Sequence, residues 1–164
     1  MSKKKAIVSV VMGSDSDLAV MSEATKILQE YDIVFEAKIL SAHRSPEDVA
    51  RFARGARGNG IKIIIAGAGG AAHLAGVIAS LTTIPVIGVP METKELKGID
   101  SLFSTVQMPS GVPVATVAIG KSGAKNAAIL ALEILGLEDA RIAKRLEAFK
   151  KDLARGVRAK NKKL

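Results

Sequence analysis

A chain of 164 residues is long enough for one domain with a full hydrophobic core, and its 48% hydrophobic and 24% charged residues are typical of a soluble globular protein. The sequence contains no cysteine, which excludes disulfides, thiolate nucleophiles and cysteine–zinc sites, and no uncharged apolar stretch is long enough to span a bilayer. The net charge of +8 comes from the two ends, because residues 6–149 carry 14 basic and 15 acidic groups. We therefore expect a single cytoplasmic domain, residues 1–164, with basic tails at 1–5 and 150–164.

Segments rich in β-branched residues alternate with segments of helical spacing along the chain. Apolar residues at 6–12 predict a strand buried on both faces, and residues 18–31 place apolar side chains on one side of a helix. Further strands are expected at 33–40, 61–66, 85–90 and 113–118, and further helices from 46, at about 71–81, around 98–105, at 124–135 and from about 138. Such alternation requires right-handed crossovers, so it predicts an α/β fold in which helices cover both faces of a parallel sheet.

Three turns that contain Gly or Ser follow the first three predicted strands, at 13–17, 41–46 and 66–74. The carboxyl ends of parallel strands meet at one edge of a sheet, where open α/β sheets bind ligands. In the first turn, Ser14 suits a phosphate oxygen at a helix N-terminus, and the carboxylate of Asp17 suits the hydroxyls of a ribose. Ordinary helix capping by the same side chains is the alternative.

Both histidines of the sequence, His43 and His73, lie in these turns. Histidine is the side chain best suited to proton transfer near neutral pH, and the guanidinium of the adjacent Arg44 can hold a phosphate. A polar surface loop would also explain the pair His43 and Arg44. His73 follows a run of Gly and Ala, so it either takes part in chemistry or orients that loop by a hydrogen bond.

The Gly-rich turn that precedes His73 permits two interpretations. Its pattern Gly67-x-Gly69-x-x-Ala72, with Glu92 after the next strand, fits a dinucleotide-binding fingerprint. However, the turn follows the third strand instead of the first, and a histidine comes directly after it. Its unpaired amides could equally bind a carboxylate or CO2, whose approach a larger side chain would block. No metal site is expected, because two histidines among small apolar residues make a poor ligand set.

Several motifs occur along the chain in one order: Val11–Asp17, Ser41–Pro46, Ala66–Leu74, Gly98–Leu102, Val106–Pro109 and Ala118–Ala128. Together they resemble the PurE family of purine biosynthesis, the N5-carboxyaminoimidazole ribonucleotide mutases, over about residues 6–150. The resemblance implies a three-layer flavodoxin-like sandwich with a central five-stranded parallel sheet. It also implies a homo-octamer whose active sites are built from neighbouring subunits, and an enzyme that uses no metal, ATP, biotin or other organic cofactor.

The resemblance implies an isomerase that moves a carboxylate from the exocyclic nitrogen of N5-carboxyaminoimidazole ribonucleotide to C4 of its ring. On this hypothesis His43 protonates the leaving nitrogen and later removes the proton from C4, while the turn at 67–72 holds CO2 between these steps. Arg44 and Ser14 would anchor the phosphate. Beside the catalytic His43, the expected substrate-binding residues are Ser14, Asp17, Ser41, Arg44, Gly67, Ala68, Gly69, Gly70, His73 and Leu74.

Three other functions remain open from the sequence. A sister branch of the family carboxylates aminoimidazole ribonucleotide directly with CO2, although the motif around His73 is similar to the mutase branch. An NAD-dependent oxidoreductase or a non-catalytic nucleotide-binding module would each explain part of the pattern. Nucleic acid and membrane partners are not expected, because the net positive charge lies in the tails and the chain has one Tyr, four Phe and no Trp for base stacking. The segment 91–112 is expected to form part of a lid or a wall between subunits.

Overall fold

The computed structural model describes residues 5–161, and this part of the chain forms two compact units that divide between Ile129 and Leu130. The expected basic ends are described only in part, because residues 1–4 and 162–164 lie outside the described residues. The organisation of the chain as a single domain stays a prediction.

The first unit is built around a parallel sheet of five strands in the order β2-β1-β3-β4-β5. The strands are β1 (Val8–Met12), β2 (Phe35–Ile39), β3 (Ile63–Ala68), β4 (Val86–Pro90) and β5 (Ala115–Thr116). Every residue of β1 and β4 is buried, as their nearly continuous apolar runs predict. The order is the flavodoxin-like one, which places a ligand-binding crevice between the carboxyl ends of β1 and β3.

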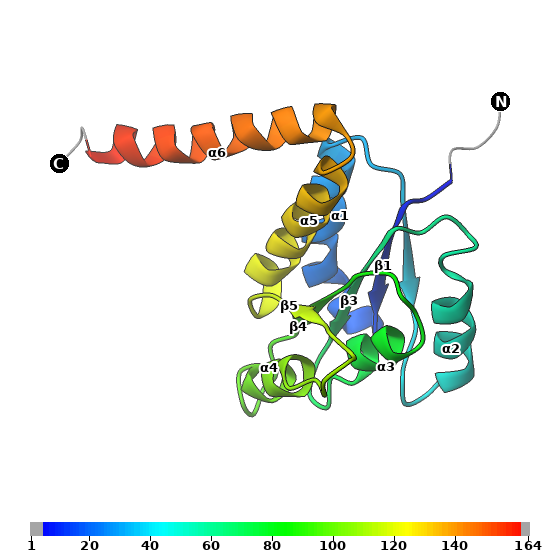
Figure 1. Ribbon diagram of the computed structural model, residues 1–164. Coiled ribbons are helices and arrows are strands. Elements are labelled where there is room, and N and C mark those ends of the chain that lie inside the picture. The colour runs from blue at the N-terminus through cyan, green and yellow to red at the C-terminus, as the bar shows by residue number, and fades with distance from the viewer. Residues whose placement is uncertain (1–4, 162–164) are drawn as a thin grey trace. The chain divides into compact units, whose positions relative to one another are not determined.

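Helices cover both faces of this sheet (Figure 1). Helices α2 (Pro46–Gly55) and α3 (Leu74–Ser80) lie on one face, where their buried side chains join those of β1 and β3 in one apolar cluster. Helix α1 (Leu18–Glu30), which follows the short 3-10 helix η1 (Asp15–Asp17), lies on the other face together with the first turns of α5 (Gly120–Gly136). The predicted three-layer α/β fold with a five-stranded parallel sheet is therefore confirmed.

The last part of the first unit departs from the predicted bounds. Strand β5 has two residues instead of the expected 113–118, because it lies at the edge of the sheet and the proline at its expected start has no N–H to donate. Helix α5 begins at Gly120, earlier than the expected residue 124. Its first turn lies so close to the preceding loop that a Cβ on Gly123 would overlap the carbonyl oxygen of Ala118.

Helix α4 (Ile99–Val106) lies at the carboxyl edge of the sheet. Unlike an ordinary surface helix, it turns polar residues inward and large apolar residues outward. Its buried residues are Ser101 and Thr105, which are polar. The methyl group of Thr105 lies so close to β4 that it occupies the space a Cβ on Gly88 would need, so only small side chains fit here. The outward face carries large apolar side chains that are roughly half exposed, those of Ile99, Phe103 and Val106.

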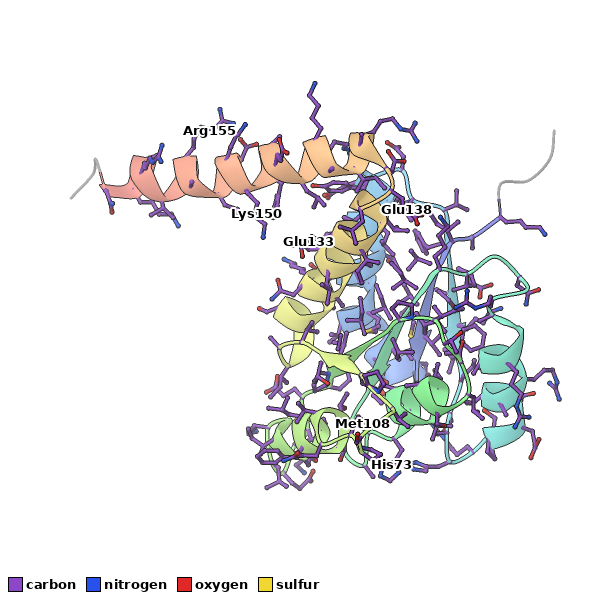
Figure 2. The ribbon with its side chains drawn as sticks, viewed as in Figure 1. His73, Met108, Glu133, Glu138, Lys150 and Arg155 are labelled. Atoms are coloured by element: carbon purple, nitrogen blue, oxygen red, sulfur yellow. The ribbon has the colours of Figure 1, made fainter. Side chains whose placement is uncertain are left out.

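The second unit consists of the remainder of α5 and the 22-residue helix α6 (Ala140–Asn161). Lys150 of α6 pairs with Glu133 of α5 at 3.4 Å, and both side chains are labelled in Figure 2. The second half of α6 is exposed and strongly basic, so the C-terminal basic segment is helical as far as Asn161. No helix within residues 5–161 has both the length and the apolar character needed to cross a membrane.

Candidate active site

The loops after β1, β2, β3 and β4 surround an open pocket of about 530 Å³ at the carboxyl edge of the sheet, a size typical of small-ligand sites. The pocket brings together nine of the eleven site residues expected from the sequence: Ser14, Asp17, Ser41, His43, Arg44, Ala68, Gly69, His73 and Leu74. Six further residues line it: Gly13, Ser16, Ala42, Ala71, Met91 and Glu92. The two histidines, the arginine and the Gly-rich loop therefore face one cavity within a single chain.

His43 and His73 contact each other at this pocket. Nε2 of His43 lies 2.8 Å from Nδ1 of His73, and the two rings meet edge to face with their centres 4.9 Å apart. One of these nitrogens donates and the other accepts, so a single proton lies between them and the tautomer of one ring fixes that of the other. Figure 2 labels His73 at the carboxyl edge, beyond the strand ends. His73 can therefore orient the ring of His43 for proton transfer.

The loop after β1 forms a capping box at the start of η1. The hydroxyl of Ser14 accepts a hydrogen bond from the N–H of Ser16 at 3.3 Å, and Oδ2 of Asp17 accepts one from the N–H of Ser14 at 3.2 Å. Burial raises the pKa of Asp17 above its ordinary value, although hydrogen bonds from Ser14 and Ser16 oppose this shift. Helix capping is therefore present, and the same three side chains also line the pocket.

Arg44 connects the loops after β1 and β2. Its Nη2 donates to the carbonyl oxygen of Gly13 at 3.0 Å, and its Nε donates to the hydroxyl of Ser41 at 3.3 Å. The Ser41 hydroxyl also accepts from the backbone N–H of Arg44 at 3.2 Å. Two of the five guanidinium N–H groups thus hold the side chain in place, and within residues 5–161 the others have no acceptor, so they can bind an anionic ligand.

Two residues of the expected binding set, Gly67 and Gly70, do not line the pocket. Gly67 is buried in β3, where its carbonyl oxygen accepts the N–H of Gly13 at 3.0 Å and where a Cβ would lie 2.5 Å from the sulfur of Met21. Gly70 has a φ of +67°, a conformation that favours glycine, and its peptide groups bond to α4. These two glycines permit close packing and a sharp turn, while the residues beside them face the cavity.

Met91 and Glu92 line the pocket although neither belongs to the binding set expected from the sequence. They follow β4, which pairs with β3 and therefore ends at the same edge of the sheet. In the sequence, Glu92 stands out only as the acid of a dinucleotide fingerprint, and Met91 gives no chemical signal. The signal that could have identified both is their position directly after a predicted parallel strand.

Residues 7–156 match the protein-family model described as AIR carboxylase. The chain is 56% identical over 164 residues to the N5-carboxyaminoimidazole ribonucleotide mutase of Pyrococcus horikoshii, which covers 100% of this chain and 92% of that protein. It is 54% identical over 157 residues to the N5-carboxyaminoimidazole ribonucleotide mutase of Thermotoga maritima, which covers 96% of this chain and 91% of that protein. Among solved structures, Treponema denticola PurE is similar with a TM-score of 0.87 and 28% sequence identity, covering 96% of this chain and 97% of that chain.

Proposed function

The chain belongs to the AIR carboxylase family, and on this premise we propose that it catalyses the N5-carboxyaminoimidazole ribonucleotide mutase reaction of purine biosynthesis. In this isomerisation a carboxylate leaves the exocyclic nitrogen and is attached to C4 of the imidazole ring, which gives 4-carboxy-5-aminoimidazole ribonucleotide. The observation that carries the proposal is the convergence of an imidazole, a guanidinium and a Gly-rich loop on one pocket. The proposal includes a cytoplasmic location, since a phosphorylated nucleotide does not cross a membrane unaided.

His43 performs the acid–base steps in this proposal. A carbamate loses CO2 when its nitrogen is protonated, so His43 donates a proton to that nitrogen and the bond between nitrogen and carboxyl carbon breaks. C4 then attacks the CO2, and the neutral His43 accepts the proton that C4 loses, which restores the aromatic ring. The proton returns to His43 and the carboxylate stays on the nucleotide, so no co-reactant is consumed. The hydrogen bond between His43 and His73 supports this role, because it holds the His43 ring in one orientation.

The other pocket residues suit the remaining parts of the nucleotide. The unoccupied N–H groups of Arg44 and the hydroxyl of Ser14 suit the phosphate, and the carboxylate of Asp17 suits the ribose hydroxyls. Ala68 and Gly69 have small side chains or none, which leaves room for CO2 beside the imidazole ring. A CO2 held there meets C4 before it escapes, which is a gain from proximity.

The names of the relatives favour the mutase over direct carboxylation of aminoimidazole ribonucleotide and over NAD-dependent oxidation. The two carboxylation reactions differ in their substrate. A coupled assay that compares the carbamate nucleotide with aminoimidazole ribonucleotide plus bicarbonate therefore separates them. Faster turnover of the second mixture would overturn the mutase assignment.

The central test is isomerisation of the carbamate nucleotide by the wild-type protein without ATP, metal or added bicarbonate. We expect turnover, and its absence despite tight binding would favour a non-catalytic nucleotide-binding module. The variant His43→Asn should lose turnover by about 100- to 10,000-fold, the usual contribution of general acid–base catalysis. It should still bind the nucleotide, because the phosphate and ribose contacts involve other residues. Lost binding with retained turnover would contradict the role of His43.

We also propose that the protein acts as a homo-octamer in which neighbouring subunits complete each site. The outward face of α4 supports this, because Ile99, Phe103 and Val106 form an apolar surface that a monomer leaves in water. The variant Phe103→Asp should lower the sedimentation coefficient by dissociating the assembly. Leu137→Asp is the control, since Leu137 is 85% exposed but lies in the second unit. An unchanged sedimentation coefficient for Phe103→Asp would contradict this use of α4.

A further inference from the structure

One turn of α4 holds both peptide groups of Gly70. The hydroxyl oxygen of Ser101 accepts the N–H of Gly70 at 2.9 Å. The hydroxyl of Ser104 is shared between the carbonyl oxygen of Asp100 at 2.8 Å and that of Gly70 at 3.2 Å. Residues three apart on a helix project to the same side, so the two serines reach the loop together. Gly70 itself does not line the pocket, but Gly69 and Ala71 on either side of it do. The contact therefore acts at the centre of the Gly-rich loop.

The burial of Ser101 is explained by this contact. Ser101 has no exposed surface, although it is polar and the outward side of the same helix is apolar. A buried hydroxyl is unfavourable unless it is hydrogen-bonded, and the N–H of Gly70 is the partner that the structure provides. Removal of the hydroxyl would leave that N–H without its acceptor, so the loop would have to move to find water.

At its centre, the Gly-rich loop has few contacts besides those with α4, although Ala72 at its end is buried. Residues 69–72 are glycine and alanine, and a Cβ on Gly70 would have no heavy atom within 4 Å. Two short-range hydrogen bonds lie within the loop, from the N–H of Ala72 to the oxygen of Gly70 and from the N–H of His73 to the oxygen of Ala71, each 2.8 Å long. Such a segment has many accessible backbone conformations, and an external contact is needed to select one.

We propose that Ser101 is a positioning residue, which holds the Gly-rich loop in the conformation that keeps CO2 next to C4 between the two carboxyl-transfer steps. This inference rests on the mutase function proposed above. Ser101 acts through the peptide of Gly70, and through the loop it also fixes the backbone from which His73 reaches His43. The phosphate and the ribose are held by other loops in the proposed function. Loss of the Ser101 hydroxyl should therefore affect the fate of CO2 more than the binding of the nucleotide.

The test compares Ser101→Ala with Thr105→Val. Thr105 is a matched control, because it lies on the same helix, is 2% exposed, and donates its hydroxyl to the backbone oxygen of Ser101 at 2.7 Å instead of to the loop. The first readout is the partition of turnover, measured as free aminoimidazole ribonucleotide released per carboxylated product formed. The second is backbone hydrogen–deuterium exchange of the loop 69–73 in the unliganded protein, which needs no substrate.

In Ser101→Ala, protection of the loop should fall by about tenfold or more, as expected when a buried N–H loses its acceptor. The released fraction of aminoimidazole ribonucleotide should rise and kcat should fall, with KM nearly unchanged. Thr105→Val should match the wild type in all of these. Unchanged exchange in Ser101→Ala, unchanged partition, or equal effects in the two variants would each overturn the proposal.

Two further outcomes keep the test informative. If Ser101→Ala does not fold, Ser104→Ala replaces it, because Ser104 is only partly buried and donates to the other peptide group of Gly70. A smaller effect in the same direction is then expected, since the N–H of Ala72 still bonds to that oxygen. If the wild type does not isomerise the carbamate nucleotide, the proposed function fails, whereas the exchange experiment still tests whether Ser101 holds the loop.

Discussion

Arg44→Lys should weaken binding of the nucleotide by about 10- to 150-fold while the positive charge is kept. In the structure, Nη2 and Nε of Arg44 are bonded to Gly13 and Ser41, and the remaining N–H groups of the planar guanidinium are left for a phosphate. A lysine has one nitrogen, so it cannot hold both loops and also bind two phosphate oxygens. The loss of one hydrogen bond to a charged group, about 1.5–3 kcal/mol, gives the stated range.

Isothermal titration with aminoimidazole ribonucleotide and with the corresponding nucleoside measures this effect. The nucleotide should lose affinity, whereas the nucleoside, which has no phosphate, should bind the variant and the wild type about equally. Arg51→Lys is the control, because Arg51 is an exposed arginine of α2 that pairs with Asp48 at 2.7 Å and does not line the pocket. Equal losses for nucleotide and nucleoside, or no loss for the nucleotide, would refute the assignment of Arg44 to the phosphate.

Two further predictions concern stability. Burial raises the pKa of Asp17, so the folded state binds more protons than the unfolded state and stability falls as pH rises through the carboxyl range above 3.8. In urea unfolding, the free energy of unfolding of the wild type should therefore rise relative to that of Asp17→Asn as pH is lowered from neutral. Relative to Asp139→Asn it should fall, because Arg141 lowers the pKa of Asp139. The same trend against both variants would contradict this. Gly123→Ala should lower the free energy of unfolding by at least about 3 kcal/mol, because the new methyl group overlaps the carbonyl of Ala118. The control Gly156→Ala, in open space on α6, should raise it by about 0.5–1 kcal/mol in the same denaturation experiment, and similar values for the two variants would contradict the packing argument.

The sheet and the edge that carries the site follow from local patterns in the sequence. The apolar run at 6–12 has few alternatives to a buried strand, and the turns after three such strands must meet at one edge of a parallel sheet. This is why the sequence places Ser14, His43 and Arg44 at one pocket, which all three of them line. The bounds of β5 could not be predicted equally well, because only Ala115 and Thr116 of its apolar segment pair with β4, and this pairing depends on how the chain packs.

The contacts between the loops could not be predicted from local patterns. His43 and His73 are 30 positions apart, and Gly70 and Ser101 are 31 apart, so their hydrogen bonds depend on how the elements pack. The apolar spacing in α4 also could not predict how this helix packs. Apolar residues at helical spacing indicate that one face of a helix is apolar, but they do not tell whether that face turns toward its own sheet or away from it. In α4 it turns away, and Ser101 occupies the inner face.

The reversed faces of α4 have a consequence for the newly synthesised chain. Until another molecule covers it, this helix presents the ring of Phe103 and the branched carbons of Ile99 and Val106 to every protein in its surroundings. Such a surface is an aggregation hazard for as long as it stays bare. If the proposed homo-octamer forms, its free subunit is the vulnerable form, and overproduction that outpaces assembly should lead to insoluble protein.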